Sequence, residues 1–427
     1  FGVGEDEYFL ASDPTALLSY TNKVVFLENG DIGRISDQGV EIFQAGDEAV
    51  DRPVVTLHWD PIQAEKGGFK HFMLKEIHEQ PQAVQDTFAG RVDFESSQVS
   101  FDSLEISAED ALSFERVQLL ACGTSWHAAL IGKFLIENLV RIPVDVDYGS
   151  EYRYREPVVN DRVLTVGISQ SGETADTLAA METAKSGGSR LFAICNVLGS
   201  EATRISEGVI YTYAGPEIGV ASTKAFTTQL VAIYLLALYL RQRRGSRLDA
   251  EHVAALAHLP SAIDEILERE AEIEELSRHY FRRDDFLFLG RGINYPIALE
   301  GALKLKEISY SHAEGYPAGE MKHGPIALID EDFPVVAIAT GDRVFDKVCS
   351  NMEQVRARDG VVIAVTDHEP SRLDGIANDV ISVPRVDDLL QPLINVVPLQ
   401  LFAYHVAVRR GADVDQPRNL AKSVTVE

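Results

Sequence analysis

Small polar residues gather in the segment Val166-Gly-Ile-Ser-Gln-Ser-Gly-Glu-Thr-Ala-Asp-Thr177, in a pattern suited to binding an anion. An apolar run leads into this segment, which therefore predicts a strand, a tight loop and the beginning of a helix. Ser169, Ser171 and Thr174 supply hydroxyls, and Gly172 lets the backbone approach a ligand closely. Free N–H groups at a helix N-terminus favour negative charge. The alternative is ordinary capping of the helix by Ser and Thr, which this segment alone does not exclude.

The segment from Ala298 to Ser309 could carry acid–base chemistry. At about 100° per residue, Glu300, Lys304 and Glu307 form one ridge on a helix that is otherwise mostly apolar. One interpretation is a Glu–Lys pair at helical spacing in a groove that faces solvent. The other is a carboxylate base held beside an ammonium group, a pairing that proton abstraction next to a carbonyl requires.

His323 and Lys422 are two further candidates for chemistry. His323 lies in a predicted loop that Gly and Pro close, Glu320-Met-Lys-His-Gly-Pro325, where it could face a cleft or have a structural role. Lys422 lies in a C-terminal segment with no pattern of its own, where a lysine is ordinarily solvated. A tail folded over a site would instead desolvate Lys422, and a lysine that loses its proton is a nucleophile for carbonyls.

The elements that must position these residues form a repeat. Strand patterns at 117–125, 163–169, 190–196 and 209–213 are matched in the same order at 285–292, 335–340, 360–366 and 380–383. Each series closes with a long apolar helix that ends in Arg-Arg-Gly. Strands alternating with helices require right-handed crossovers, so the sequence predicts two doubly wound α/β domains with parallel sheets. Ligands bind beyond the carboxyl ends of such strands, where 122–125 and 169–174 fall.

Two other regions differ from this repeat. Residues 1–65 contain short β runs divided by turn residues, and a stretch rich in Pro and Gly at 60–68 suits a linker. Between the two predicted domains, apolar residues at helical spacing predict one packing helix from Ser261 to Tyr280, with its glutamates on a solvated face. Gly219-Val-Ala-Ser-Thr-Lys224 offers hydroxyls at the beginning of another helix, and taken alone it predicts a cap.

Composition excludes several classes of function. The chain has 427 residues and a formal net charge of −27, which argues against nucleic acid or an anionic membrane as partner. Its longest apolar run, from Leu230 to Leu240, has 11 residues and is too short to span a bilayer. The three cysteines have no Cys-x-x-Cys spacing and the histidines show no metal-binding spacing, so we expect no disulfide framework, no metal and a reducing, cytoplasmic location.

Taken together, these motifs closely resemble the glucosamine-6-phosphate synthase family, the isomerizing glutamine:fructose-6-phosphate amidotransferases. The resemblance covers nearly the whole chain through six segments: Cys122-Gly-Thr-Ser, Ser169-Gln-Ser-Gly-Glu-Thr, 217–227, 298–310, Lys322-His-Gly-Pro and Gln416-Pro-Arg-Asn-Leu-Ala-Lys-Ser-Val-Thr-Val-Glu. It implies two sugar-isomerase (SIS) domains in tandem, at 70–248 and 249–412. A tail at 413–427 would lie over the active site, and residues 1–65 would be the remnant of a β-rich glutaminase domain.

The resemblance also implies roles for individual residues. Fructose 6-phosphate would be held through its phosphate by Ser169, Gln170, Ser171 and Thr174, and its sugar would be lined by Thr124, Ser125, Val220, Ser222 and Ala421. Lys422 would form an imine with the C2 ketone, and His323 would assist ring opening. Glu307, with Lys304 nearby, would move the proton between C1 and C2. Ammonia would enter at C2, glucosamine 6-phosphate would leave, and no cofactor would be needed.

One departure from the family pattern matters for function. The glutaminase nucleophile of this family is an N-terminal cysteine, whereas the first residue here is Phe1 and all three cysteines lie in the later domains. We therefore do not expect this chain to hydrolyse glutamine. The resemblance further implies a homodimer whose active sites are shared between chains. Two other hypotheses remain, a simple sugar-phosphate isomerase or deglycase and a non-catalytic sugar-phosphate sensor.

Overall fold

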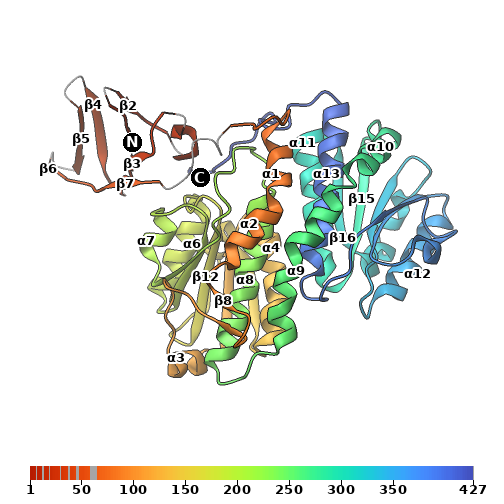
Figure 1. Cartoon of the computed structure of the whole chain (residues 1–427), viewed down its shortest axis with the longest axis horizontal. Coiled ribbons are helices and arrows are strands. Elements are labelled where there is room, and N and C mark those ends of the chain that lie inside the picture. The colour runs from red at the N-terminus through yellow and green to blue at the C-terminus, as the bar shows by residue number, and fades with distance from the viewer. Residues whose placement is uncertain are drawn as a thin grey trace.

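Two parallel β-sheets, each covered by helices, form most of the protein. The computed structural model describes residues 1–426 except 6, 12–13, 19, 29, 37–38, 45–47 and 58–64. In Figure 1 the two α/β units lie side by side, and a smaller β-rich part, containing the N-terminus, lies apart from the second of them. The predicted linker residues 60–64 lie outside the described residues. The domain boundaries given above stay predictions.

The first sheet contains β10 (Arg116–Ala121), β11 (Val144–Tyr148), β12 (Val163–Ser169), β13 (Arg190–Cys195) and β14 (Gly208–Tyr211). Its strands are parallel and follow the order β11-β10-β12-β13-β14. The helices of this unit are α3 (Ala108–Ser113), α4 (Gly123–Leu139), α5 (Gly149–Tyr152), α6 (Ala175–Ser186), α7 (Glu201–Ile205) and α8 (Lys224–Arg243). Every residue of β12 is buried, as expected for a central strand covered on both faces.

The second sheet repeats this topology. It contains β15 (Asp285–Gly290), β16 (His312–Pro317), β17 (Pro334–Ile338), β18 (Val361–Thr366) and β19 (Asp379–Ser382), all parallel, in the order β16-β15-β17-β18-β19. Its helices are α11 (Tyr295–Ser309), α12 (Phe345–Arg356) and α13 (Gln391–Arg409), with short 3₁₀ turns η3 (Gly292–Asn294), η4 (Ala318–His323), η5 (Pro325–Leu328) and η6 (Pro370–Leu373). The predicted pair of doubly wound α/β domains is confirmed.

The repeat has one strand more per sheet than the sequence predicts. The fifth strands, β11 and β16, lie at the edge of their sheets next to β10 and β15. The sequence of β16 is His-Ala-Glu-Gly-Tyr-Pro, which has no apolar run. An edge strand is hydrogen-bonded on one side only and tolerates polar residues and Pro, so its pattern is weaker than that of a central strand.

The N-terminal part is β-rich, as predicted. One sheet contains β1 (Gly2–Val3), β2 (Tyr8–Phe9), β3 (Lys23–Val25) and β7 (Val54–Thr56), and another contains β4 (Ile32–Ser36), β5 (Gly39–Gln44) and β6 (Glu48–Ala49). A 3₁₀ turn, η1, spans Pro14–Leu17. Helices α1 (Phe72–His78) and α2 (Gln80–Phe88) and the hairpin β8 (Val92–Asp93) and β9 (Gln98–Val99) then lead to the first sheet.

The predicted single helix from Ser261 to Tyr280 is wrong. The structure has two helices there, α9 (Ala250–Leu267) and α10 (Glu270–Tyr280), separated near Arg269. The break brings Glu270, at the beginning of α10, between His78 of α1 (2.7 Å) and His405 of α13 (2.9 Å). These contacts join distant segments, so the helical spacing of the sequence could not indicate the break.

Two long helices form the centre of the hydrophobic core. In α8 every residue from Lys224 to Leu240 is buried, and in α13 every residue from Gln391 to Ala407 is buried. A helix that is apolar around most of its circumference must be covered on all sides. Among the described residues, no helix is long and apolar enough to cross a membrane.

Candidate functional site

The loop after β12 has the geometry of an anion site. The Ser169 hydroxyl accepts the Gly172 N–H (3.0 Å) and lies 3.3 Å from the Thr174 hydroxyl, while the Ser171 hydroxyl accepts the Glu173 N–H (3.2 Å). Gly172 has a φ of +70°, and a Cβ atom there would lie 2.1 Å from the Ser200 hydroxyl. Glycine is therefore required at this turn.

Thr174 occupies the N-cap position of α6, yet no cap hydrogen bond of its side chain is found within the described part of the chain. The first N–H of this helix, that of Ala175, donates instead to the carbonyl oxygen of Val424 in the C-terminal tail (3.0 Å). The interpretation of these residues as simple caps thus fails for Thr174. The tail lies directly over the loop.

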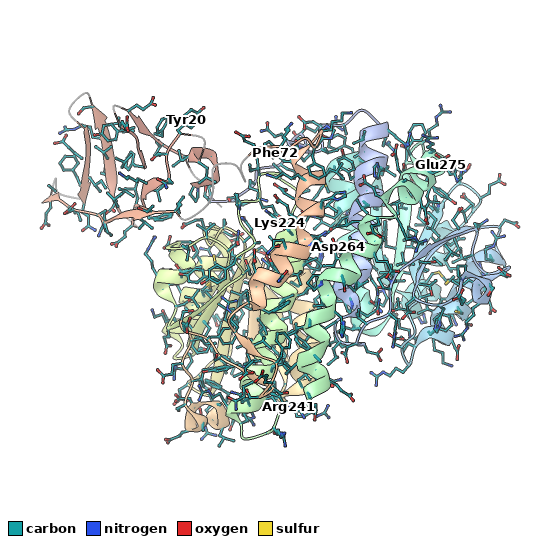
Figure 2. The ribbon with its side chains drawn as sticks, in the orientation of Figure 1. Tyr20, Phe72, Lys224, Arg241, Asp264 and Glu275 are labelled. Carbon is teal, nitrogen blue, oxygen red and sulfur yellow. The ribbon has the colours of Figure 1, made fainter. Side chains whose placement is uncertain are left out.

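The C-terminal tail is fastened at several points. The Asp415 carboxylate accepts the N–H groups of Phe72 (3.0 Å) and Met73 (2.9 Å) at the beginning of α1, and Phe72 is labelled in Figure 2. The carbonyl oxygen of Asp415 accepts the Val220 N–H (3.0 Å). Further along, the Arg418 N–H donates to the Tyr310 hydroxyl (2.9 Å), so the tail also contacts the end of α11. These bonds bring Lys422 to the segment before α8.

Lys422 is bound by a buried carboxylate. Its Nζ donates to Glu217 Oε2 (2.7 Å) and to the carbonyl oxygen of Gly219 (2.7 Å). Glu217 Oε1 accepts N–H groups at the beginning of α8, from Thr223 (2.8 Å) and Ala225 (3.1 Å). Burial raises the pKa of the Glu217 carboxyl, but Lys422 and these N–H groups together lower this pKa by more than burial raises it, so the net shift is downward. Glu217 is therefore a carboxylate paired with Lys422.

A second buried carboxyl supports this segment. Glu76 Oε1 accepts the N–H groups of Ile218 (2.5 Å) and Gly219 (3.1 Å). Burial and the neighbouring Glu217 raise the pKa of Glu76 to about 7. Lys224, which is the first residue of α8 and is labelled in Figure 2, pairs with Glu79 (2.7 Å) rather than with Glu76 or Glu217.

The ridge on α11 is buried rather than in a solvent-facing groove. Lys304 Nζ lies 2.6 Å from Glu307 Oε2 and 3.4 Å from Glu300 Oε1, and the side chains of Lys304 and Glu300 are completely inaccessible to solvent. Burial lowers the pKa of Lys304, but Glu300 and Glu307 raise it more strongly, so its net shift is upward. The arrangement is a carboxylate held beside a charged ammonium.

One cleft of about 220 Å³ brings nearly all the predicted residues together. Its lining includes Thr124, Ser125, Ser169, Gln170, Ser171, Thr174, Val220, Ser222, Glu307, Ala421 and Lys422. Lys304 lies behind Glu307 and donates to the Thr124 hydroxyl (3.1 Å). His323, at the end of η4, is exposed and does not belong to the described lining of this cleft.

Sequence reasoning missed two residues of this site, Glu217 and His127, and recognised Glu300 without assigning it a role. Glu217 holds Lys422, Glu300 holds Lys304, and His127 lies with its Nδ1 2.7 Å from Glu300 Oε2. Glu300 was visible as part of the ridge, but its partners Thr124 and His127 come from α4, far away in the sequence. Glu217 precedes a glycine-containing segment and shows no pattern that distinguishes it from a surface glutamate.

A larger cavity, of about 520 Å³, lies between α10 and β19. Its lining mixes apolar side chains such as Ile266 and Leu276 with Arg269, Glu272 and His279. We place the candidate site in the smaller cleft because hydroxyls, a buried ion pair and a helix N-terminus converge there, at the carboxyl ends of the strands.

Comparisons with known proteins identify the family of this chain. The SIS domain family matches residues 113–239 and 279–410. Glutamine–fructose-6-phosphate aminotransferase [isomerizing] of Caldanaerobacter subterraneus is 47% identical over 429 residues, which cover the whole of this chain and 70% of that protein. The enzyme of the same name from Thermus thermophilus is 51% identical with the same coverage.

A solved structure shows the same architecture. The C-terminal domain of glucosamine-fructose-6-phosphate aminotransferase from Francisella tularensis superimposes with a TM-score of 0.78 at 42% identity, covering 82% of this chain and all of that one. Tagatose-6-phosphate ketose/aldose isomerase from Escherichia coli shares the fold alone, with a TM-score of 0.66 at 18% identity. The chain is an enzyme of the isomerizing glutamine–fructose-6-phosphate aminotransferase family and carries that family's two SIS domains.

Proposed function

We propose that the cleft binds fructose 6-phosphate and converts it to glucosamine 6-phosphate by amination and ketose–aldose isomerisation. The nitrogen is ammonia, which we propose derives normally from glutamine, and the reaction is the first step of hexosamine synthesis in the cytoplasm. The observation that carries this proposal is that Lys422 and Glu307 line the same cleft as the anion loop. A nucleophile for carbonyls and a proton carrier thus face one bound sugar phosphate.

The phosphate is assigned to the loop after β12. Ser169, Ser171 and Thr174 provide hydroxyls, Gln170 lies between them, and the N-terminus of α6 favours the negative charge. Thr124 and Ser125, at the beginning of α4, also line the cleft and are assigned to the hydroxyls of the sugar. Val220, Ser222 and Ala421 complete the lining of the cleft.

The chemical steps follow from the remaining groups. The neutral amine of Lys422 attacks the C2 ketone, a C–N bond forms, and the ketone oxygen leaves as water. The Lys422 ammonium group must lose a proton before this attack, and Glu217 Oε2, which lies 2.7 Å from Lys422 Nζ, can accept that proton. Ammonia then forms a bond to C2 and displaces Lys422, which regains a proton. Glu307 takes a proton from C1 and returns it to C2, while the C1 hydroxyl loses its proton and the imine nitrogen gains one, which gives the amino aldose.

The test is product analysis after incubation with fructose 6-phosphate and either glutamine or an ammonium salt. Glucosamine 6-phosphate from the ammonium salt supports the proposal. Glucose 6-phosphate under all conditions, without amino sugar, would favour a simple isomerase or deglycase. Binding of fructose 6-phosphate without any product would favour a sensor, and glutamate release from glutamine would contradict the expectation that this chain does not hydrolyse glutamine.

A further inference from the structure

We propose that Glu300 is a positioning residue that sets the basicity of Glu307 by balancing the charge of Lys304. The inference rests on the proposed function, in which Glu307 must accept and then return a proton. Glu300 itself does not belong to the described lining of the cleft, so it acts through Lys304 rather than on the substrate.

The three side chains form a compact charged group on α11. Lys304 Nζ lies between Glu307 Oε2 at 2.6 Å and Glu300 Oε1 at 3.4 Å. Lys304 and Glu300 are wholly buried, whereas Glu307 keeps 21% of its side chain exposed towards the cleft. Only Glu307 can therefore meet the substrate, and the other two form its inner support.

Helix α4 holds Glu300 from the other side. The Thr124 hydroxyl lies 3.1 Å from Glu300 Oε1, and His127 Nδ1 lies 2.7 Å from Glu300 Oε2. Thr124 also accepts a hydrogen bond from Lys304 Nζ (3.1 Å). A fully buried carboxylate with three partners has a fixed position, and this fixes the ammonium that Glu307 contacts.

The charges of Glu300, Lys304 and Glu307 explain how the second carboxylate, that of Glu300, affects protonation of Glu307. If Lys304 faced Glu307 alone, protonation of Glu307 would leave an unpaired ammonium in the protein interior, which is costly. With Glu300 present, protonation of Glu307 leaves a neutral Lys304–Glu300 pair. Glu300 thus lowers the free energy needed to protonate Glu307 during the reaction, because a nearby like charge raises the pKa of a carboxyl.

Other titratable groups face this cluster from neighbouring elements. Glu217, before α8, acts on Lys304 through its charge, and Lys422 of the tail is paired with Glu217. His127 of α4 faces Glu300. These groups remain when Glu300 alone is changed, so a pH profile compared with that of the wild type isolates the contribution of Glu300.

The experiment measures the pH dependence of kcat/KM for conversion of fructose 6-phosphate, supplied with an ammonium salt, to glucosamine 6-phosphate. Glu300→Gln keeps the size of the side chain and removes its charge. We expect kcat to fall at least about tenfold with KM nearly unchanged, and the acid limb of the profile to move to lower pH by about one unit or more. Glu300→Asp keeps the charge, so its acid limb should stay at the wild-type position even though its rate is lower.

His127→Gln is the matched control, because it removes a partner of Glu300 and leaves both carboxylates in place. Its acid limb should stay at or above the wild-type pH. An unshifted limb in folded Glu300→Gln, or a lowered limb in Glu300→Asp or His127→Gln, would overturn the inference. If Glu300→Gln does not fold, the other two variants decide. Absence of activity in the wild type would instead refute the proposed function, so the two failures are distinguishable.

Discussion

At the scale of single residues, Lys422 is the group whose proposed role has the most direct chemical test. Sodium borohydride reduces an imine to a stable secondary amine, so treatment of the protein with fructose 6-phosphate should attach the sugar to Lys422. Lys422→Arg should abolish this labelling, because arginine stays protonated at any working pH. Peptide mass mapping locates the adduct. Lys306→Arg, at an exposed position of α11, is the control and should label as the wild type does. Labelling at another lysine would reject the assignment.

Ser171 tests the anion loop. Its side chain is 5% exposed and accepts the Glu173 N–H, so Ser171→Ala removes both a phosphate partner and the acceptor of that N–H group. We expect fructose 6-phosphate to bind about 1–3 kcal/mol more weakly, roughly a 5- to 150-fold increase in Kd. Isothermal titration calorimetry measures the Kd of both proteins. Ser186→Ala, at an exposed position near the end of α6, should leave Kd unchanged. Equal Kd values for Ser171→Ala and the wild type would count against this loop as the phosphate site.

Much of the site could be predicted at this scale, because hydroxyls, glycine and lysine appear in short local motifs. The ridge of Glu300, Lys304 and Glu307 was visible from helical spacing, but its burial was not, since α4 covers it from a distant part of the sequence. Glu217 could not be identified, because its partner Lys422 lies 205 residues away. Side chains that act through long-range contacts leave little trace in the local pattern.

At the scale of elements, the break between α9 and α10 has a stability consequence. Glu270 lies between His78 of α1 and His405 of α13, and hydrogen bonds from these two histidines lower the pKa of Glu270 to about 2. The folded-state pKa thus lies below the ordinary value of 4.5. The stability contributed by this group is present above about pH 4.5 and is lost as the pH falls towards 2.

Glu270→Gln should therefore lower stability near neutral pH and flatten its decline in acid. Denaturant midpoints of the variant and the wild type, measured from about pH 7 to about pH 3, should converge as the pH falls. Glu275→Gln is the control on the same helix, since Glu275 is largely exposed and, within the described residues, its ion pair is with Arg278 on the surface. Its midpoints should stay parallel to those of the wild type. A constant gap for Glu270→Gln would refute the linkage.

The order of the elements was more predictable than their ends. Three of the four strands recognised in each sheet are central, and central parallel strands are buried on both faces and appear as apolar runs; the fourth, β14 or β19, is an edge strand with a short apolar run of its own. The edge strands β11 and β16 were missed because their sequences, Val-Asp-Val-Asp-Tyr and His-Ala-Glu-Gly-Tyr-Pro, are rich in the polar residues that an edge tolerates. The join between α9 and α10 was missed because it depends on contacts with α1 and α13, whereas helical periodicity continues across it.

At the scale of the whole molecule, one topology occurs twice but the candidate site occurs once. The cleft takes its anion loop from the first unit, its Glu307 from α11 of the second and its Lys422 from the tail. The tail reaches it through Asp415, which accepts N–H groups from α1. In the proposed function, the two units together would surround one sugar phosphate, and each unit alone would lack part of the cleft.

His323 is exposed at the end of η4 and lies outside the described lining of the cleft in its own chain, so a role for it would involve more than one copy of the molecule. We propose that it serves the cleft of a second copy in a twofold dimer. Each composite site would then take Glu307 and Lys422 from one protomer and His323 from its partner. A twofold dimer places the same surface of both protomers in contact, so both sites would be completed at once.

Mixing two inactive variants tests this arrangement. In a dimer of His323→Ala with Glu307→Ala, one site would combine an intact Glu307 with an intact His323, and the other would lack both. Random pairing makes about half of the dimers mixed, so about one quarter of wild-type activity should return after dissociation and reassembly. If His323 acted on its own chain, each site of a mixed dimer would lack one of the two residues, and no activity would return. Absence of rescue in a sample that native mass spectrometry shows to contain mixed dimers would therefore exclude the shared site.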